Sequence, residues 1–126
     1  MIWIAIAAGG AIGAISRHAL NHVAHTYWFS SKFPAGTLIV NLVGCAVIGL
    51  LAGLLASNRI ELRFYWREFV FVGILGGFTT FSTFGLDTFV LARTQSFTQA
   101  AVNVTAHVVG GLLAVWVGYQ IGTFGR

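Results

Sequence analysis

The chain consists of four long apolar stretches separated by short polar connections. The apolar stretches cover residues 1–23, 34–56, 64–92 and 97–124. Each is long enough for a helix that crosses a hydrocarbon core, which takes about 20 apolar residues. The pattern therefore predicts an all-α integral membrane protein with four transmembrane helices, forming a single domain over residues 1–126.

The third stretch is too long for one straight span. Roughly 29 helical residues would measure ~43 Å, against a hydrocarbon core of ~30 Å. Within it, Gly76 and Gly77 are followed by Phe78 and the polar run 79–83, TTFST. Paired glycines weaken a helix, and Ser and Thr hydroxyls can bind the backbone groups that a break sets free. We predict that the third helix breaks at Gly76 and Gly77.

Glycine pairs at a spacing of four occur in every predicted span: Gly9 with Gly13, Gly49 with Gly53, Gly73 with Gly77, and Gly118 with Gly122. Such pairs let two helix backbones approach closely in lipid. They predict tight helix packing and indicate no particular function.

The composition agrees with a membrane protein, with 57% hydrophobic and 8% charged residues. A single cysteine, Cys45, excludes a disulfide scaffold or a thiolate zinc site. Three acidic residues are too few for a carboxylate metal cluster, and the seven basic residues form no run that would bind nucleic acid. We also find no nucleophile with a base and an orienting group nearby, so an enzyme is not expected.

The basic residues divide almost evenly between the two sides of the predicted bundle. One side carries Arg59, Arg63, Arg67 and Arg126, and the other carries Arg17, Lys32 and Arg93. Such a balance allows insertion in either orientation and hence an antiparallel homodimer. The alternative is an oriented protein in which Arg17 lies inside its span. A bundle this thin has little room for an aqueous path, so a transport function favours assembly with a second copy.

Polar groups inside the spans are the candidates for function. Arg17 either attracts an anion or extends to the headgroups, and we favour the second reading. Asn41 either bonds to a neighbouring helix or donates to a permeating anion. Asp87 is the acidic residue expected within or near a span, in a vestibule or paired with Arg93 or another base.

The fourth span carries Asn103 and His107 one turn apart on one face, and with Asn41 they suggest a narrow polar track. His18, His22 and His25 share one face of the first helix at a spacing that could ligate a metal. Because no carboxylate or thiolate joins them, we interpret these three as an interfacial polar face.

The segment 76–84, GGFTTFSTF, is the strongest local feature. Phe81 and Phe84 lie three residues apart beside Ser82 and Thr83, which combines hydroxyl donors with ring edges of positive quadrupole charge. From spacing alone, we interpret the two phenylalanines as ordinary core residues. Carbonyl groups freed at the helix break could hold a cation.

Three strings in order, GGAIGAISR at 9–17, PAGTLIVNLVG at 34–44 and GGFTTFSTF at 76–84, resemble the Fluc-type fluoride channels of the CrcB family. The resemblance extends over nearly the whole chain. It implies a dual-topology, antiparallel homodimer in the bacterial inner membrane. Such a dimer passes fluoride out of the cell down its electrochemical gradient through two pores and so relieves fluoride toxicity.

The resemblance also implies site residues. Those of the pore are Phe81, Phe84, Asn41, Thr37, Ser82 and Thr83, with Asn103 and His107 from the fourth span. Arg17 and Asp87 belong to a vestibule, and the carbonyls of Gly76 and Thr79 hold a structural sodium ion between the subunits. The chain departs from the family where Asn103 and Gly111 align with a frequent Tyr and Ser, and where Asp87 replaces Glu. Asn103 then serves as a substitute donor, and His107 adds pH sensitivity.

Two other classes are compatible with the hydropathy. A small multidrug or guanidinium exporter of four helices requires a Glu within the first helix, and residues 1–23 contain none. A non-transporting membrane subunit would need only the glycine pairs. This class does not explain why Asn41 and the TTFST run are present within apolar spans.

Overall fold

The computed structural model describes residues 1–28 and 33–125, and this part of the chain contains helices and no strands. The helical elements are α1 (Ile2–Val23), η1 (Ala24–Trp28), α2 (Ala35–Ala56), α3 (Phe64–Arg67), η2 (Glu68–Leu75), α4 (Gly76–Phe78), α5 (Phe81–Thr94) and α6 (Phe97–Thr123). The two η elements are π-helical. Lys32 and Arg126, which entered the charge balance, lie outside the described residues.

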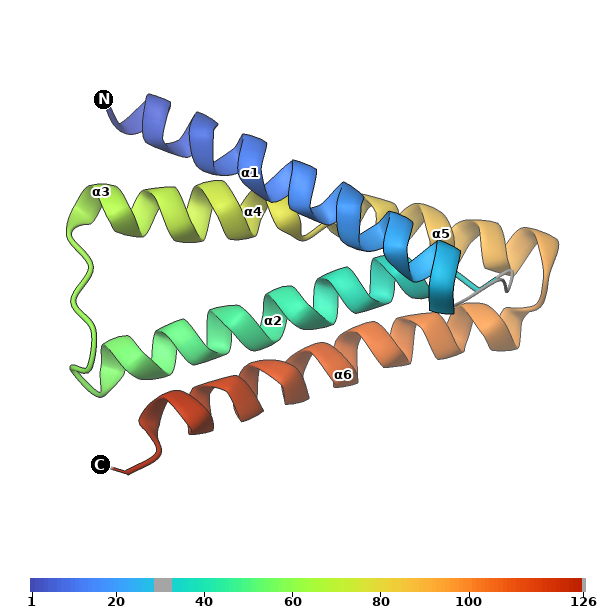
Figure 1. The fold of residues 1–126 in the computed structure, drawn as a ribbon. Coiled ribbons are helices and arrows are strands. Elements are labelled where there is room, and N and C mark those ends of the chain that lie inside the picture. The colour runs from blue at the N-terminus through green and yellow to red at the C-terminus, as the bar shows by residue number, and fades with distance from the viewer. Residues whose placement is uncertain (29–32, 126) are drawn as a thin grey trace.

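These elements form an antiparallel bundle of four long rods, with both chain ends on the same side (Figure 1). Among the described residues, four helical stretches are long and apolar enough to cross a membrane: Ile2–Thr26, Ala35–Ala56, Phe64–Thr94 and Phe97–Thr123. The predicted number and order of spans are confirmed, with boundaries within a few residues of those expected.

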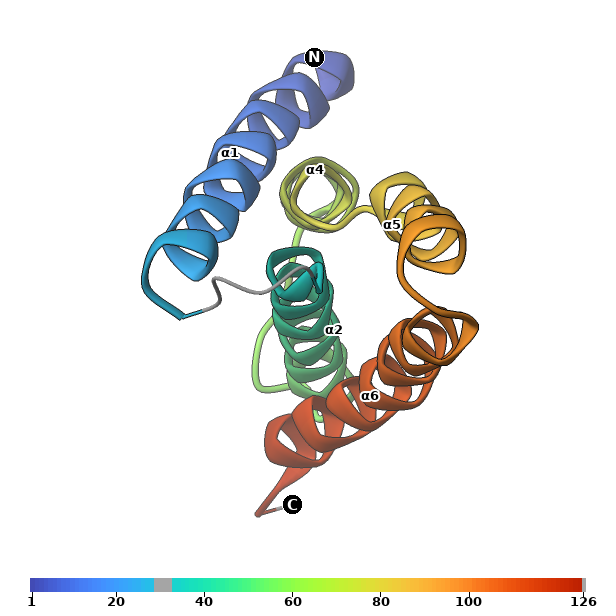
Figure 2. The same cartoon turned by 90° about the vertical axis from the view of Figure 1, so that its right-hand side faces the viewer.

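The bundle is built from two closely packed helix pairs, α1 against η2 and α4, and α2 against α6 (Figure 2). Glycines form both contacts. A Cβ atom on Gly9 would lie 3.0 Å from the Cα of Gly73, and one on Gly53 would lie 3.0 Å from the Cα of Gly122. Because these side chains are single hydrogens, the backbones touch directly, so the prediction of close packing from glycine spacing is confirmed.

The third span is interrupted, but not at the glycine pair. Gly76 and Gly77 belong to the helical turn α4, and the backbone becomes extended at Thr79 (φ −81°, ψ 161°) and Thr80 (φ −152°, ψ 115°). Gly77 is helical because its bare Cα lets α4 pack onto α1, where an added Cβ would lie 3.1 Å from the Cα of Gly10. The predicted position of the break was therefore wrong by two to three residues.

Side-chain hydroxyls start the two helices that follow. The Thr80 hydroxyl accepts from the backbone N–H of Thr83 at the start of α5, and Ser96 does the same for Gln99 at the start of α6. Both are N-caps, which satisfy backbone donors that a first helical turn leaves free. Pro34 precedes α2 instead of opening it, and Ala35 is the first helical residue.

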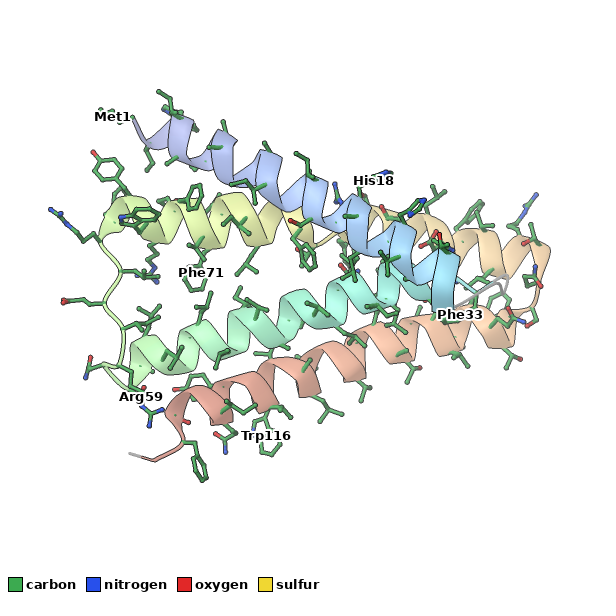
Figure 3. The ribbon with its side chains drawn as sticks, viewed as in Figure 1. Met1, His18, Phe33, Arg59, Phe71 and Trp116 are labelled. Carbon is green, nitrogen blue, oxygen red and sulfur yellow. The ribbon has the colours of Figure 1, made fainter. Side chains whose placement is uncertain are left out.

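The outer surface of the bundle is strongly apolar. Large side chains such as Trp3, Leu112 and Trp116 are exposed, and Trp116 points outward from α6 (Figure 3). An apolar outer surface on helices of this length suits a lipid environment. The chain is a multi-pass membrane protein.

Candidate functional site

Asn41 holds the break in the third span in place. From the middle of α2, its amide Nδ2 donates to the carbonyl of Thr80 (3.0 Å), and its Oδ1 accepts from the Thr80 backbone N–H (2.9 Å). The amide thus gives the Thr80 N–H the acceptor that it would have in a continuous helix, and it adds a donor to the Thr80 carbonyl. Of the two roles considered for Asn41, the structure shows the interhelical bond, and this bond leaves one of the two amide N–H groups for another acceptor.

An open groove of about 400 Å³ lies beside this bridge. Its walls come from α2, the two halves of the third span and α6, and they bring together six of the residues singled out from the sequence: Asn41, Gly76, Thr79, Phe81, Phe84 and His107. Figure 3 shows Phe71, another wall residue, on the side of η2 that faces α2. Asn41 and His107, which are 66 positions apart in the sequence, therefore line the same groove. Its walls are mostly apolar and carry a few polar groups.

Three rings form a row at the α5 and α6 side of the groove. The centroids of Phe81 and Phe84 are 5.4 Å apart with an interplanar angle of 56°, and those of Phe84 and His107 are 4.4 Å apart with an angle of 39°. Phe81 is 82% exposed, whereas Phe84 is half-buried. Phe81 therefore presents much of its ring to the surroundings of the chain, and Phe84 is fixed between two rings.

A polar cluster joins α5 to α6 behind these rings. The fully buried Asn103 donates from Nδ2 to the Thr88 hydroxyl (2.9 Å), which in turn donates to the carbonyl of Phe84 (2.8 Å). One turn later, His107 Nδ1 lies 3.0 Å from the backbone carbonyl oxygen of Asn103. The predicted common face of Asn103 and His107 is confirmed, and Asn103 lies behind the groove wall, in contact with Thr88.

A second, polar pocket of about 340 Å³ lies on the other side of the Asn41 bridge, between α1, α2 and the start of α5. Its wall includes Arg17, Thr37, Ser82 and Thr83, and Thr80 lines both cavities. The Thr37 hydroxyl donates to the carboxylate of Asp87 over 2.7 Å. Asp87 thus has Thr37 as its partner, and the guanidinium of Arg93 lies 6.0 Å from the centroid of Phe89. Of the settings considered for Asp87, the structure shows a side chain that points from α5 toward α2 and bonds to Thr37.

Arg17 reaches the same region from α1. Its guanidinium donates to the carbonyl of Thr79 over 3.3 Å, and the side chain is half-buried. The preferred interpretation, in which Arg17 extends to the headgroups, was wrong. The freed carbonyl at the break is a better partner, because it has no helical N–H donor and lies within reach of α1.

The break also provides backbone oxygens that suit a cation. The Gly76 carbonyl loses its usual i+4 donor because the N–H of Thr80 is donated to Asn41. A Cβ on Gly76 would have no neighbour closer than 3.9 Å, so its surroundings are open. The Thr79 carbonyl already accepts from Arg17 and retains one lone pair. The donor set fits a hard monovalent cation, and two oxygens from one chain are too few to replace its hydration shell.

The three histidines of the first span do not form a metal site. His18, His22 and His25 are exposed along α1 and η1. Within residues 1–28 and 33–125, no group of three or more His, Cys, Asp or Glu side chains could hold a metal ion.

Thr80 and Thr88 are site residues that were not singled out from the sequence. Thr80 lies at the junction of the two cavities, and Thr88 connects Asn103 to the backbone of Phe84. Threonine is a preferred N-cap residue, and this preference could have placed the break at Thr80. No local signal pairs Thr88 with Asn103, because the two lie on different helices.

Comparisons with known proteins point to one family. The family described as "CrcB-like protein, Camphor Resistance (CrcB)" matches residues 4–119. A protein of Methylobacillus flagellatus is 42% identical over 116 residues, covering 92% of this chain and 90% of its own length. One from Nitrobacter winogradskyi is 43% identical over 118 residues, covering 94% and 92%. A third, from Opitutus terrae, is 42% identical over 119 residues, covering 94% and 89%. All three relatives are named fluoride-specific ion channel FluC.

Proposed function

This chain belongs to the CrcB-like family, and on that premise we propose that it is a passive, fluoride-selective ion channel of the bacterial inner membrane. Fluoride leaves the cell down its electrochemical gradient, which relieves fluoride toxicity. No chemical step is catalysed. The whole chain acts as one four-helix channel domain.

The observation that carries this proposal is the arrangement of the two cavities on either side of the Asn41–Thr80 bridge. One cavity offers the exposed hydroxyl of Ser82, the hydroxyl of Thr83 and the cationic side chain of Arg17. The other is lined by the rings of Phe81 and Phe84, whose edges carry positive quadrupole charge. Thr80 lines both cavities.

Fluoride is the anion that these groups suit best. It is small and strongly hydrated, so it enters a low-dielectric path only where fixed donors replace its water molecules. The second N–H of Asn41, the hydroxyls of Ser82 and Thr83, and the ring edges supply such donors without a full positive charge in the groove. Thr37 lies beside them and donates its own hydroxyl to Asp87.

We further propose that two copies assemble as an antiparallel homodimer with two pores. The near-even division of basic residues favours neither orientation. The groove is open on one side, and Phe81 on its rim is 82% exposed in the single chain. A second copy would close the groove with protein instead of lipid.

A structural sodium ion fits at the dimer interface in this proposal. The carbonyls of Gly76 and Thr79 would hold it, with the same two oxygens from the second copy completing the ligand set. When bound, the ion supplies a positive charge that links the two subunits. Gly76 and Thr79 contribute by keeping their carbonyls free of helical N–H donors.

Fluoride release from liposomes that contain the purified protein tests the function. A fluoride electrode follows the release, valinomycin allows a compensating potassium current, and chloride serves as the control anion. We expect fast fluoride release that requires valinomycin, with no chloride release. Well-folded dimers that release no fluoride would overturn the proposal, and drug or guanidinium transport under a proton gradient would then be measured.

Replacing Phe81 or Phe84 by isoleucine should slow fluoride release about tenfold or more, which corresponds to about 1.4 kcal/mol in the barrier. The reason is the loss of ring edges, whose positive quadrupole faces the anion. Phe97→Ile is a matched control, because Phe97 is also 82% exposed and does not line the groove. An unchanged flux in both groove variants, measured in the same liposome assay, would exclude the ring-edge role.

Gly76→Leu tests the sodium site. The single chain has room for this side chain, so helix content measured by circular dichroism should be unchanged. We expect a lower dimer fraction in size-exclusion chromatography. We also expect loss of the rise in thermal midpoint that sodium gives the wild type, because an ion that binds only the native state stabilises it. Gly85→Leu is the control, since a Cβ there meets nothing within 4 Å. A sodium effect that persists in Gly76→Leu would disprove the assignment.

A further inference from the structure

The Thr83 hydroxyl differs from most threonine hydroxyls of the third span in its hydrogen bonds. Those of Thr79, Thr88 and Thr94 each donate to the backbone carbonyl four residues earlier, over 3.0, 2.8 and 2.8 Å. This carbonyl is a common partner for a threonine in a helix. Thr83 Oγ1 instead accepts from the Thr80 hydroxyl over 3.0 Å, and among the described residues its own O–H has no acceptor.

Thr80 causes this difference, because its own polar groups are all bonded. Asn41 binds its backbone N–H and its carbonyl. The Thr80 hydroxyl oxygen accepts from the Thr83 backbone N–H over 3.2 Å, and its proton goes to Thr83 Oγ1. Ser82 Oγ is farther from Thr80 Oγ1, at 3.4 Å, so Thr83 is the closer acceptor. Because a hydroxyl has one proton, Thr83 cannot donate back along the same bond, and its proton points away from Thr80.

Thr83 belongs to the wall of the polar pocket of about 340 Å³, together with Arg17 and the exposed Ser82. The carbonyl that Thr83 would otherwise use, that of Thr79, already accepts from the Arg17 guanidinium over 3.3 Å. A guanidinium can only donate, and a hydroxyl whose oxygen is already accepting offers its proton. Donors that lack an acceptor within the chain suit an anion in the pocket.

Resting on the proposed fluoride function, we propose that Thr80 is a positioning residue, whose hydroxyl turns the proton of Thr83 toward the permeating anion. The Thr80 hydroxyl has no proton left for the ion, so it acts through Thr83. Because Asn41 holds the Thr80 backbone at both its N–H and its carbonyl, this direction is set before an ion enters. A donor fixed in advance stabilises an ion without the cost of reorientation. Without the Thr80 hydroxyl, Thr83 would present its lone pairs as readily as its proton.

A double-mutant cycle tests the inference, with fluoride release from liposomes as the readout. Thr80→Val removes the hydroxyl and keeps the branched shape of the side chain. We expect it to slow release about threefold or more in the wild-type background. In the Thr83→Val background it should cause no further slowing, because the hydroxyl through which Thr80 acts is already gone. Thr80→Ser, which retains the hydroxyl, should release fluoride at the wild-type rate.

The thermal midpoint in detergent separates positioning from a merely structural role. Thr80 also accepts from the Thr83 backbone N–H, an N-cap bond that Thr83→Val does not remove. Thr80→Val should therefore lower the midpoint equally in both backgrounds, although it slows release in only one. If Thr80→Val does not fold, Thr80→Gly removes the same hydroxyl at a smaller cost to the N-cap. Thr94→Val is the control, because Thr94 donates to the Val90 carbonyl and lines neither cavity.

Two outcomes of this cycle would overturn the inference while the channel function stands. One is fluoride release at the wild-type rate in both Thr80→Val and Thr80→Gly. The other is an equal slowing by Thr80→Val with and without the Thr83 hydroxyl.

A second measurement does not depend on transport. Fluoride that binds the folded protein should raise its thermal midpoint relative to chloride, with both anions given as sodium salts at equal concentration. We expect this rise to be smaller in Thr80→Val and in Thr83→Val, with no further decrease in the double variant, whereas Thr94→Val should keep it. A rise that Thr80→Val leaves at its wild-type size overturns the inference, even if release assays show no channel at all.

Discussion

Asn41→Leu should both destabilise the protein and abolish fluoride release. Leucine has the same branching and number of side-chain heavy atoms as asparagine but cannot bind the N–H and carbonyl of Thr80, which the wild-type amide holds at 2.9 and 3.0 Å. The Thr80 N–H, left without an acceptor inside the bundle, costs about 1–3 kcal/mol. We expect a clear fall in the thermal midpoint in detergent, measured by size-exclusion chromatography after heating, and fluoride release at the background rate.

Val43→Leu is the control for this variant. Val43 lies in the same helix and is 41% exposed, so a larger apolar side chain there should leave both stability and flux near the wild-type values. A second variant separates the two hydrogen bonds, because Asn41→Asp keeps an acceptor for the Thr80 N–H and loses the donor to the Thr80 carbonyl. Wild-type stability in Asn41→Leu would show that the bridge does not fix the break.

Gly118→Ala should destabilise the contact between α2 and α6 by about 2–3 kcal/mol, the cost of inserting a methyl group into a closely packed site. A Cβ at this position would overlap the carbonyl oxygen of Ala46 and lie 2.8 Å from the backbone nitrogen of Leu50. Backbone atoms cannot rotate away as a side chain can, so the two helices would have to separate. The measurement is again the thermal midpoint in detergent.

Gly111→Ala is the matched control on the same helix. Gly111 is also buried, but a Cβ there would meet only the Cys45 sulfur at 3.4 Å, an ordinary contact distance. Since alanine favours a helix over glycine by about 1 kcal/mol, this variant should be as stable as the wild type or more stable. Equal thermal midpoints for Gly118→Ala and Gly111→Ala would show that the direct backbone contact does not determine how α2 and α6 pack.

The hydropathy pattern was sufficient to predict the spans, because every element that crosses lipid must be long, apolar and internally hydrogen-bonded. The same holds for the glycine pairs, which let helices approach wherever they occur. The position of the break was harder to predict. Propensity alone favours Gly76 and Gly77, whereas the structure places the break at Thr79 and Thr80. What shifts it is the amide of Asn41, which lies 39 positions earlier in the chain.

The residues of the candidate site also divide into those that could be predicted from the sequence and those that could not. Phe81, Phe84 and Asn41 could be singled out because polar and aromatic residues are conspicuous within apolar spans. The partners of Arg17 and Asp87 could not be predicted, because the Thr79 carbonyl and the Thr37 hydroxyl reach them from other helices. Thr88 was missed for the same reason: its connection to Asn103 exists only where α5 and α6 meet.

Hydropathy and the three motifs are properties of the linear chain, and they are sufficient to predict a four-span membrane bundle of the CrcB-like family. The position at which the third span opens, the carbonyls that become free, and the meeting of the groove with the polar pocket at Thr80 depend on how the helices pack. A backbone group inside a membrane must find a partner. Which partner it finds depends on the helix that packing brings beside it.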